Sequence, residues 1–122
     1  MNNHLQGIDT IIVRVRDIAF SHQWYAENLG LTPQWEDPIL KLVVLDTGGP
    51  TSLTLWQTDA PVANSPEGSA YPIFRTRNAM EARKDLLARN VRVDPIITDH
   101  VVTYFRFYDP DSNVLEACQV HA

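Results

Sequence analysis

Histidine is the side chain best suited to exchange protons near neutral pH, and the sequence holds four of them. His4 and His121 lie in the terminal segments, and His22 falls on the exposed side of a predicted helix. Only His100, which follows Asp99 between two predicted strands, stands where it could act as an acid or a base. A lone loop histidine is more often simply solvated, so both interpretations of His100 stay open.

The second group of polar residues is the run DPDSN at 109–113. Its proline fixes one backbone dihedral, its aspartates can accept hydrogen bonds from nearby amides, and its asparagine tolerates a left-handed backbone. These properties are typical of a tight turn between two strands. We predict a structural role for the run, with no chemistry of its own.

Composition excludes several classes of function. The formal charge is −5 and the ten Lys and Arg residues are scattered, which argues against nucleic acid as a partner. No apolar run is long enough to cross a bilayer, and residues 1–7 have neither the basic start nor the apolar core of a secretory signal. Cys118 is the single cysteine and lies in an apolar stretch, which favours a buried reduced thiol over the disulfide framework of a secreted protein, and a catalytic cysteine is the less favoured alternative. These features predict a cytoplasmic protein with no membrane partner.

Positioning these residues requires regular elements, which the sequence predicts in two similar halves of one domain, residues 1–122. In the first half, Asp17 can cap a helix that Gly30 ends. The predicted elements are a strand at 8–15, the helix at 18–29 and strands at 32–36, 40–46 and 51–57. A turn-rich linker at 58–69 follows.

The second half repeats this order over residues 70–120. Asn78 can cap its helix, for which we expect Met80, Leu86 and Leu87 as core contacts. The predicted elements are a strand at 71–76, the helix at 79–88 and strands at 91–98, 101–108 and 114–120, the first of these three kinked or begun late because of Pro95.

The repeat predicts an α+β fold of two βαβββ modules, at about 8–57 and 70–120, with the helices outside mixed sheets. One helix can cover only one face of each sheet, so the other face must be buried differently. It could curl into a cup around a ligand, pack on the other half, or pair with a second subunit. A duplicated ferredoxin-like domain is the competing fold, and its strand-helix-strand order fits poorly.

Three segments resemble the vicinal-oxygen-chelate superfamily of glyoxalases, bleomycin-resistance proteins and extradiol dioxygenases. IDTIIVRVRD with WYAENLGL resembles the family's first strand and helix, and YPIFRTRN resembles the first strand of its second module. The most specific segment, FRFYDPDSNVLEACQ, is similar to the closing hairpin, which turns on Asp-Pro-Asp-Gly-Asn. Ser112 stands where that turn has glycine, so we predict that Asn113 or a changed turn type takes up the positive dihedral. The resemblance covers nearly the whole chain and implies sheets curled into a cup.

The resemblance also implies metal-ligand positions at Thr10 and Thr54 in the first module and at Tyr71 and Glu116 in the second. Only Glu116 is a good ligand, because divalent Zn, Ni, Mn or Fe sites use several imidazole, carboxylate or thiolate groups. We therefore predict no bound cofactor. A divalent metal held with the help of Glu116 stays open as the alternative.

Strand alternation names the other side chains of the cup, because residues two apart on a strand share a face. The predicted ligand-binding residues are Thr10, Ile12, Arg14, Thr54, Trp56, Tyr71, Ile73, Arg75 and Glu116. Arg14 and Arg75 could together bind a carboxylate or phosphate. In the alternative, the arginines extend to water and Glu116 neutralises one of them.

The leading functional hypothesis is a metal-independent protein that binds a small molecule in the cup and works as a homodimer, as resistance members of the family do. One alternative is a lyase, isomerase or dioxygenase in which Glu116, with or without a metal, handles a proton next to a carbonyl. His100 would be the second candidate catalytic residue. The other alternative is a structural or interaction domain whose cup is filled by its own side chains.

Overall fold

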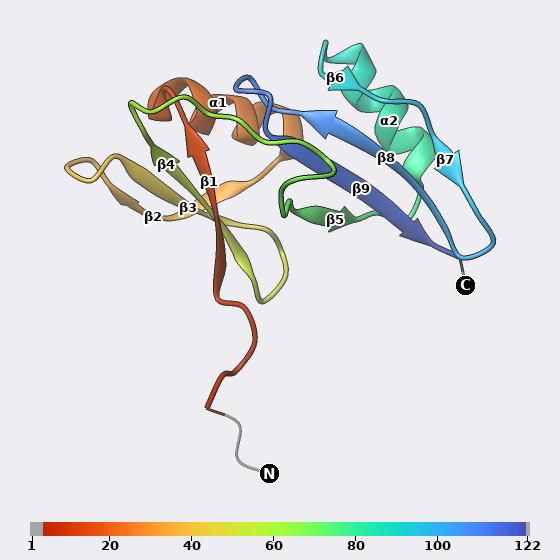
Figure 1. The fold of residues 1–122 in the computed structure, drawn as a ribbon, viewed down its shortest axis with the longest axis horizontal. Coiled ribbons are helices and arrows are strands. Elements are labelled where there is room, and N and C mark those ends of the chain that lie inside the picture. The colour runs from red at the N-terminus through yellow and green to blue at the C-terminus, as the bar shows by residue number, and fades with distance from the viewer. Residues whose placement is uncertain (1–3, 122) are drawn as a thin grey trace. The chain divides into compact units, whose positions relative to one another are not determined.

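The computed structural model describes residues 4–121, so the first three residues of the amino-terminal segment lie outside it. The chain forms two compact units, Met1–Ala60 and Pro61–Ala122, and the boundary falls inside the predicted linker. Each unit is a sheet with one helix on one of its faces (Figure 1). Within the described residues, neither helix is long and apolar enough to cross a membrane.

The first unit contains one helix and a four-stranded sheet over the residues that the structure describes. Its elements are β1 (Thr10–Val15), α1 (Ile18–Leu29), β2 (Thr32–Asp37), β3 (Leu42–Asp46) and β4 (Ser52–Gln57). The strand order is β1-β4-β3-β2, with β1 parallel to β4 and the other pairs antiparallel. The predicted strand-helix-strand-strand-strand order is confirmed.

Alternation along these strands separates a core face from an open face. Val13 and Val15 are buried on the face that α1 covers, whereas Ile12, which directly precedes Val13, is 52% exposed on the other face. The helix starts where Asp17 Oδ1 accepts a hydrogen bond from the Phe20 amide at 3.0 Å, as predicted. It ends at Gly30, whose φ of 69° is left-handed and therefore suits glycine.

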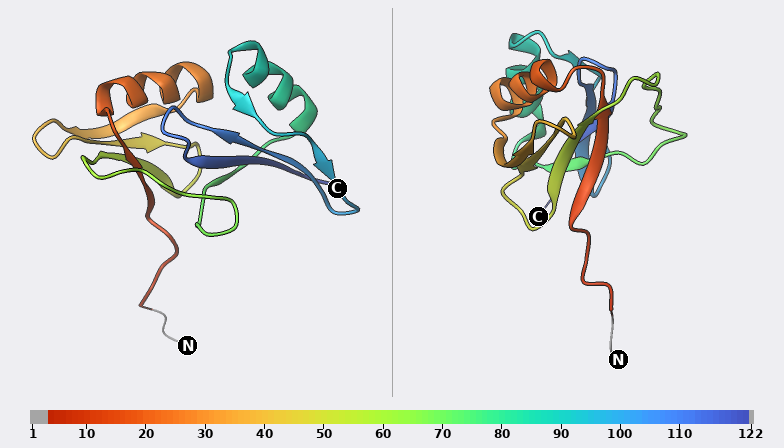
Figure 2. Two further views of the ribbon diagram at one scale, coloured as in Figure 1. Left: turned by 45° about the horizontal axis from the view of Figure 1, so that its top comes forward. Right: turned by 90° about the vertical axis from the view of Figure 1, so that its left-hand side faces the viewer.

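The second unit repeats the arrangement (Figure 2). Its elements are β5 (Ile73–Arg75), α2 (Ala79–Ala88), β6 (Arg92–Val93), β7 (Ile97–Thr98), β8 (Val102–Tyr108) and β9 (Val114–Val120). The order is β5-β9-β8-β6, with β5 parallel to β9 and β7 also paired to β8. Pro95 separates β6 from β7, because proline has no amide to give to a sheet, so the predicted kinked strand is two short ones.

Two core contacts predicted for α2 are wrong. Met80 is 66% exposed and Leu87 is 53% exposed, whereas Leu86 and Ala79 are buried. Residues seven apart share one stripe of a helix, so 79 and 86 face the sheet together while 80 and 87 lie together on a neighbouring stripe. The cap is as predicted, since Asn78 Oδ1 accepts from the Glu81 amide at 3.0 Å.

The turn between β8 and β9 corrects a second prediction. Ser112, and not Asn113, has the positive dihedral, with a φ of 63°. Asn113 is buried and committed to other contacts: its backbone amide and its Nδ2 both donate to the carboxylate of Asp109, at 2.9 and 2.8 Å. Its Oδ1 accepts from Asn64 of the linker. Because these bonds fix Asn113, the preceding residue has to complete the reversal of the chain.

Candidate functional site

The open face of the second sheet carries a compact group of polar and aromatic side chains. Register places Ile73, Glu116 and Arg106 in one row across β5, β9 and β8. Arg75, Cys118 and Tyr104 form the neighbouring row. Tyr71 precedes β5 by two residues and reaches Glu116, because its hydroxyl lies 3.5 Å from Glu116 Oε1. We call Tyr71, Tyr104, Arg106 and Glu116 the arginine cluster.

Glu116 is the most buried member of this cluster, with 6% of its surface exposed. Burial raises the pKa of Glu116 above its ordinary value, and Arg106 and the Tyr71 hydroxyl oppose that rise. Arg106 Nε lies 3.8 Å from Glu116 Oε1 and donates to the Tyr71 hydroxyl at 3.4 Å. The carboxylate therefore has a cation and a hydroxyl at hand, in a place where water reaches it poorly.

Arg106 is a functional candidate that is not among the predicted site residues. The signal was available in the hairpin: a turn at 109–113 that pairs Tyr108 with Val114 also sets Arg106 opposite Glu116. The cation beside Glu116 is thus Arg106, whereas the prediction named Arg14 or Arg75 for that role. Rings flank the guanidinium, with Tyr71 at 5.9 Å and Tyr104 at 5.8 Å from the guanidinium carbon. Both rings are therefore within cation–π range of the guanidinium.

Arg75 and Ile73 lie on the same open face of the second sheet. Ile73 is 56% exposed, and Arg75 is also exposed and makes no hydrogen bond or ion pair with any residue that the structure describes. Cys118 in the same row is half-buried, and burial raises the pKa of its thiol, which keeps it protonated. The thiol therefore lacks the environment of a reactive cysteine.

The open face of the first sheet is mostly neutral. Thr10 and Thr54 both lie on it, and their hydroxyls form a hydrogen bond to each other at 2.7 Å. Ile12 pairs with Thr54 on the neighbouring strand and leaves an apolar surface beside it. The two hydroxyls satisfy one another, and Thr54 is 5% exposed.

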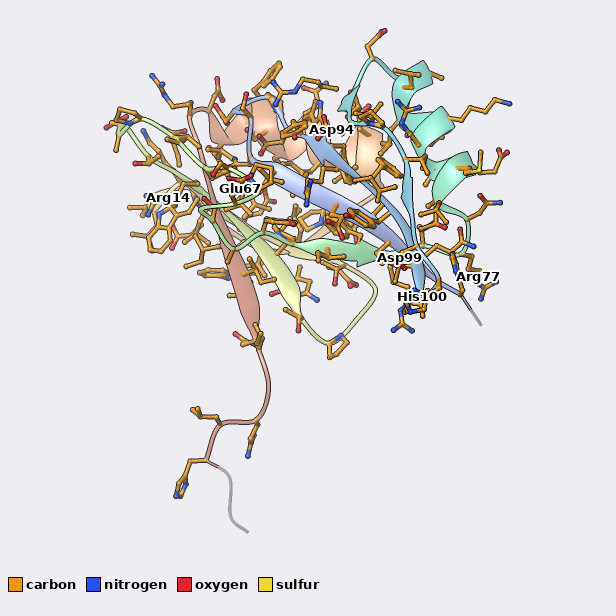
Figure 3. All side chains as sticks on the ribbon, turned by 45° about the vertical axis from the view of Figure 1, so that its right-hand side comes forward. Arg14, Glu67, Arg77, Asp94, Asp99 and His100 are labelled. Atoms are coloured by element: carbon orange, nitrogen blue, oxygen red, sulfur yellow. The ribbon has the colours of Figure 1, made fainter. Side chains whose placement is uncertain are left out.

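Arg14 lies at the end of this first face and is held by backbone carbonyls (Figure 3). Its Nε donates to the Trp56 carbonyl at 3.2 Å and its terminal nitrogen to the Gln57 carbonyl at 3.0 Å. The guanidinium also lies 5.0 Å from the centre of the Trp56 ring, whose Nε1 donates to the Leu40 carbonyl. Arg14 and Arg75 belong to different units, so their pairing on one anion stays a prediction.

His100 lies in the turn between β7 and β8 (Figure 3). The neighbouring Asp99 serves that turn, because its Oδ1 accepts from the amides of Val101 and Val102 at 2.7 and 2.8 Å. These two bonds lower the pKa of Asp99. A strand rises about 3.3 Å per residue, so the start of β8 at Val102, next to the turn that holds His100, lies roughly 13 Å along the strand from Arg106. A catalytic role for His100 stays a prediction.

The residues at the four family metal positions do not fit a divalent cation. Thr10 and Thr54 are neutral and bonded to each other, and Tyr71 is a phenol. The one carboxylate, Glu116, has a guanidinium at 3.8 Å, which would repel a metal ion bound there. Among the described residues, no group of three or more His, Cys, Asp or Glu side chains could hold a metal.

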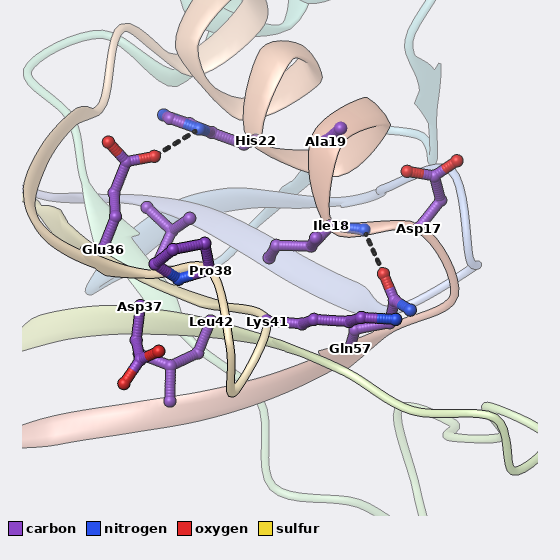
Figure 4. Close-up of a pocket in the computed structure, with 11 residues that line it drawn as sticks. Asp17, Ile18, Ala19, His22, Glu36, Asp37, Pro38, Lys41, Leu42 and Gln57 are labelled. Atoms are coloured by element: carbon purple, nitrogen blue, oxygen red, sulfur yellow. Dashed lines mark hydrogen bonds and ion pairs between the residues drawn. The ribbon is translucent and has the colours of Figure 1, made fainter.

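A pocket of about 440 Å³ lies elsewhere in the first unit, between the start of α1 and the β2-β3 hairpin (Figure 4). Its polar groups mostly hold the protein together: Gln57 Oε1 accepts from the Ile18 amide at 3.0 Å, and His22 Nδ1 lies 3.6 Å from Glu36. It is lined by Asp17, Ile18, Ala19, His22, Glu36, Asp37, Pro38, Lys41, Leu42, Val43 and Gln57. None of the predicted ligand-binding residues is among them.

Comparison with known proteins agrees with this fold. The family model for the Glyoxalase/Bleomycin resistance protein/Dioxygenase superfamily matches residues 7–117. No curated protein matches the sequence. The solved structure of TnmS3, an antibiotic binding protein from Streptomyces sp. CB03234, is 23% identical with a TM-score of 0.79, over 98% of this chain and 100% of that one.

Two other solved structures extend the likeness. The fosfomycin resistance protein FosX from Listeria monocytogenes is 13% identical with a TM-score of 0.80, over 96% of this chain and 95% of that one. A glyoxalase family protein from Enterococcus faecalis is 19% identical with a TM-score of 0.77, over 93% and 98% of the two chains. At these identities the structural likeness shows the fold alone.

Proposed function

Since the chain belongs to the glyoxalase, bleomycin-resistance protein and dioxygenase superfamily, we propose that it binds a small organic molecule without a metal ion. The observation that carries this proposal is the ion pair between Arg106 and Glu116 at 3.8 Å. Glu116 is the one good metal ligand at the family positions, and the Arg106 guanidinium balances its negative charge as a metal ion would. The solved structure of an antibiotic binding protein with the same fold supports binding as the activity.

The open faces have the composition that small-molecule sites use. Such sites combine apolar and aromatic walls with a few polar groups that orient the ligand. Here Ile73 and Tyr104 supply apolar and aromatic surface, and Arg106 supplies the polar group. The binding residues proposed in the second unit are therefore Tyr71, Ile73, Arg75, Tyr104, Arg106 and Glu116.

The test has two arms. In the first, the protein is purified without chelator, loaded with nickel, zinc, manganese or iron, desalted and analysed for metal. We expect substoichiometric metal in every case, whereas stoichiometric metal that Glu116→Gln abolishes would reject metal independence.

In the second arm, thermal unfolding is measured with a panel of aromatic drugs and small organic acids. A ligand at a hundred times its Kd stabilises the folded state by about 2.7 kcal/mol, which raises the Tm by several degrees. If no compound of the panel raises the Tm, the result would favour a structural or interaction domain instead.

One observation favours a second candidate function, that of a lyase, isomerase or dioxygenase. Glu116 is buried on an open sheet face and its pKa is raised, which suits a general base acting next to a carbonyl. Glu116→Gln separates the two functions. In an enzyme it abolishes turnover while binding persists, and in a binding protein it changes affinity alone.

We also propose that the protein works as a homodimer in the cytoplasm. Exposed apolar side chains on the first sheet, Ile12 at 52% and Trp35 at 56%, lie in one row and would be covered by a partner. A single free thiol suits a reducing compartment. Size-exclusion chromatography with light scattering at low concentration tests the dimer, and a monomer throughout would reject it. Fractionation of cells tests the location.

A further inference from the structure

The arginine cluster has hydrogen-bond donors that no residue among 4–121 accepts from. The Nε of Arg106 donates to the Tyr71 hydroxyl and forms the ion pair with Glu116. Its two terminal nitrogens make no hydrogen bond to any residue that the structure describes, although 29% of the side chain is exposed. A guanidinium presents those nitrogens as a planar fork, whose spacing matches the two oxygens of a carboxylate.

The charges around the fork favour a single negative charge on the ligand. The strands of this face carry the guanidinium groups of Arg75, Arg92 and Arg106, and the carboxylate of Glu116 lies among them. Asp94 follows β6 and already accepts a hydrogen bond from Tyr108 at 2.6 Å. This face therefore has an excess of positive charge in a chain whose formal charge is −5. A monoanion balances so small an excess better than a phosphate dianion does.

The surface next to the fork favours a flat apolar body. Tyr104 lies 5.8 Å from the Arg106 guanidinium carbon and occupies the next row of the sheet. Ile73 lies in the same row as Arg106 and is 56% exposed. An aromatic ring near a guanidinium fork, with an exposed aliphatic side chain two strands away in the same row, gives a planar ligand both an apolar contact and an anchor.

We propose that the arginine cluster binds aromatic monocarboxylates, with the ligand carboxylate on the terminal nitrogens of Arg106 and its ring against Tyr104 and Ile73. Arg75 adds long-range attraction from the neighbouring row. This inference rests on the proposed function, because it names the class of ligand for the same site. Glu116 competes with the ligand for Arg106, so removing its charge strengthens binding.

Isothermal titration with 2-naphthoate, the neutral 2-naphthamide and cyclohexanecarboxylate tests the proposal. We expect naphthoate to bind more tightly than cyclohexanecarboxylate, which lacks an aromatic ring to pack against Tyr104. We expect it to bind at least roughly tenfold more tightly than naphthamide, because a charge-assisted hydrogen bond is worth about one to two powers of ten in affinity. Arg106→Gln is expected to remove that preference, and Arg106→Lys to restore part of it. Arg89→Gln removes one positive charge from the C-terminal end of α2 and should leave the preference unchanged.

Arg106→Gln alone leaves Glu116 without its cation and could unfold the protein. Arg106→Gln with Glu116→Gln keeps the cluster neutral, and circular dichroism verifies its fold. This double variant should bind naphthoate and naphthamide equally, whereas Glu116→Gln alone should bind naphthoate several-fold more tightly.

The outcomes separate the two proposals. Equal binding of acid and amide by the natural protein, or an acid preference that survives in the folded double variant, overturns the monocarboxylate inference. The same holds if neither naphthyl compound binds while another member of the drug panel does. If the full panel is silent as well, the proposed binding function fails with it.

Discussion

Replacing Asp109 with alanine should destabilise the protein by about 3–4 kcal/mol, because one carboxylate organises the turn that sets the register of β8 and β9. Asp109 is 5% exposed and accepts hydrogen bonds from the backbone amides of Asp111 and Asn113, each at 2.9 Å, and from Asn113 Nδ2 at 2.8 Å. The two donors of Asn113 are buried, and each one left without an acceptor costs about 1–3 kcal/mol. The Asp111 amide can reach water and adds little.

Urea denaturation followed by circular dichroism measures this loss as a lower midpoint at unchanged slope. Asp109→Asn should lose less, about 1–2 kcal/mol, because its oxygen still accepts from the backbone while its amide opposes Asn113 Nδ2. Asp59→Ala is the matched control: the residue is exposed, and surface changes of this kind stay within about 0.5 kcal/mol. A loss below about 1 kcal/mol for Asp109→Ala, or an equal loss for Asp59→Ala, would refute this account of the turn.

Two further predictions concern the open faces. Burial raises the pKa of Glu116 above its ordinary value of 4.5, so the stabilisation that its protonated form provides is complete below that pH and is lost as pH rises through the raised pKa. As pH rises from 4.5 through the raised pKa, the Tm of the natural protein should therefore fall relative to the Tm of Glu116→Gln. Tm curves that run parallel over this pH range would contradict the prediction. Thr10→Val leaves the buried Thr54 hydroxyl without its partner and should cost about 1–2 kcal/mol, whereas valine at both positions should return stability close to the natural value. Urea midpoints measure both, and a double variant weaker than the single one would contradict the pairing.

Much of the fold could be predicted from local signals. Asp17, Gly30 and Asn78 delimit the helices as expected, because capping depends on residue type and on a few neighbouring amides. The repeated order of elements then predicted two sheets, as observed. What failed depended on tertiary contacts: Asn64, fifty residues from Val114, holds the turn in place, so Ser112 takes the left-handed backbone.

Only part of the candidate site could be predicted from the sequence. Alternation from Thr10 and Tyr71 identified side chains that share an open face, since the period of a strand is two. It also placed Ile73 with Glu116 correctly. Arg106 could not be predicted from the family ligand positions, because these lie on or next to the parallel pairs β1-β4 and β5-β9, whereas Arg106 lies on β8, the antiparallel partner of β9 across the hairpin.

The two sheets share a topology but have diverged in the chemistry of their open faces. On the first, the two family positions form a neutral hydrogen bond between Thr10 and Thr54, and Arg14 at the end of the face donates to backbone carbonyls. On the second, the Arg106 guanidinium lies beside Glu116, and its terminal nitrogens make no hydrogen bond to any residue that the structure describes. A bound metal offers its free coordination positions to many donor atoms, whereas a guanidinium fork prefers a planar anion. Selectivity should therefore depend on the second unit, and substitutions at Arg106 should change which ligands bind more than substitutions at Thr10 do.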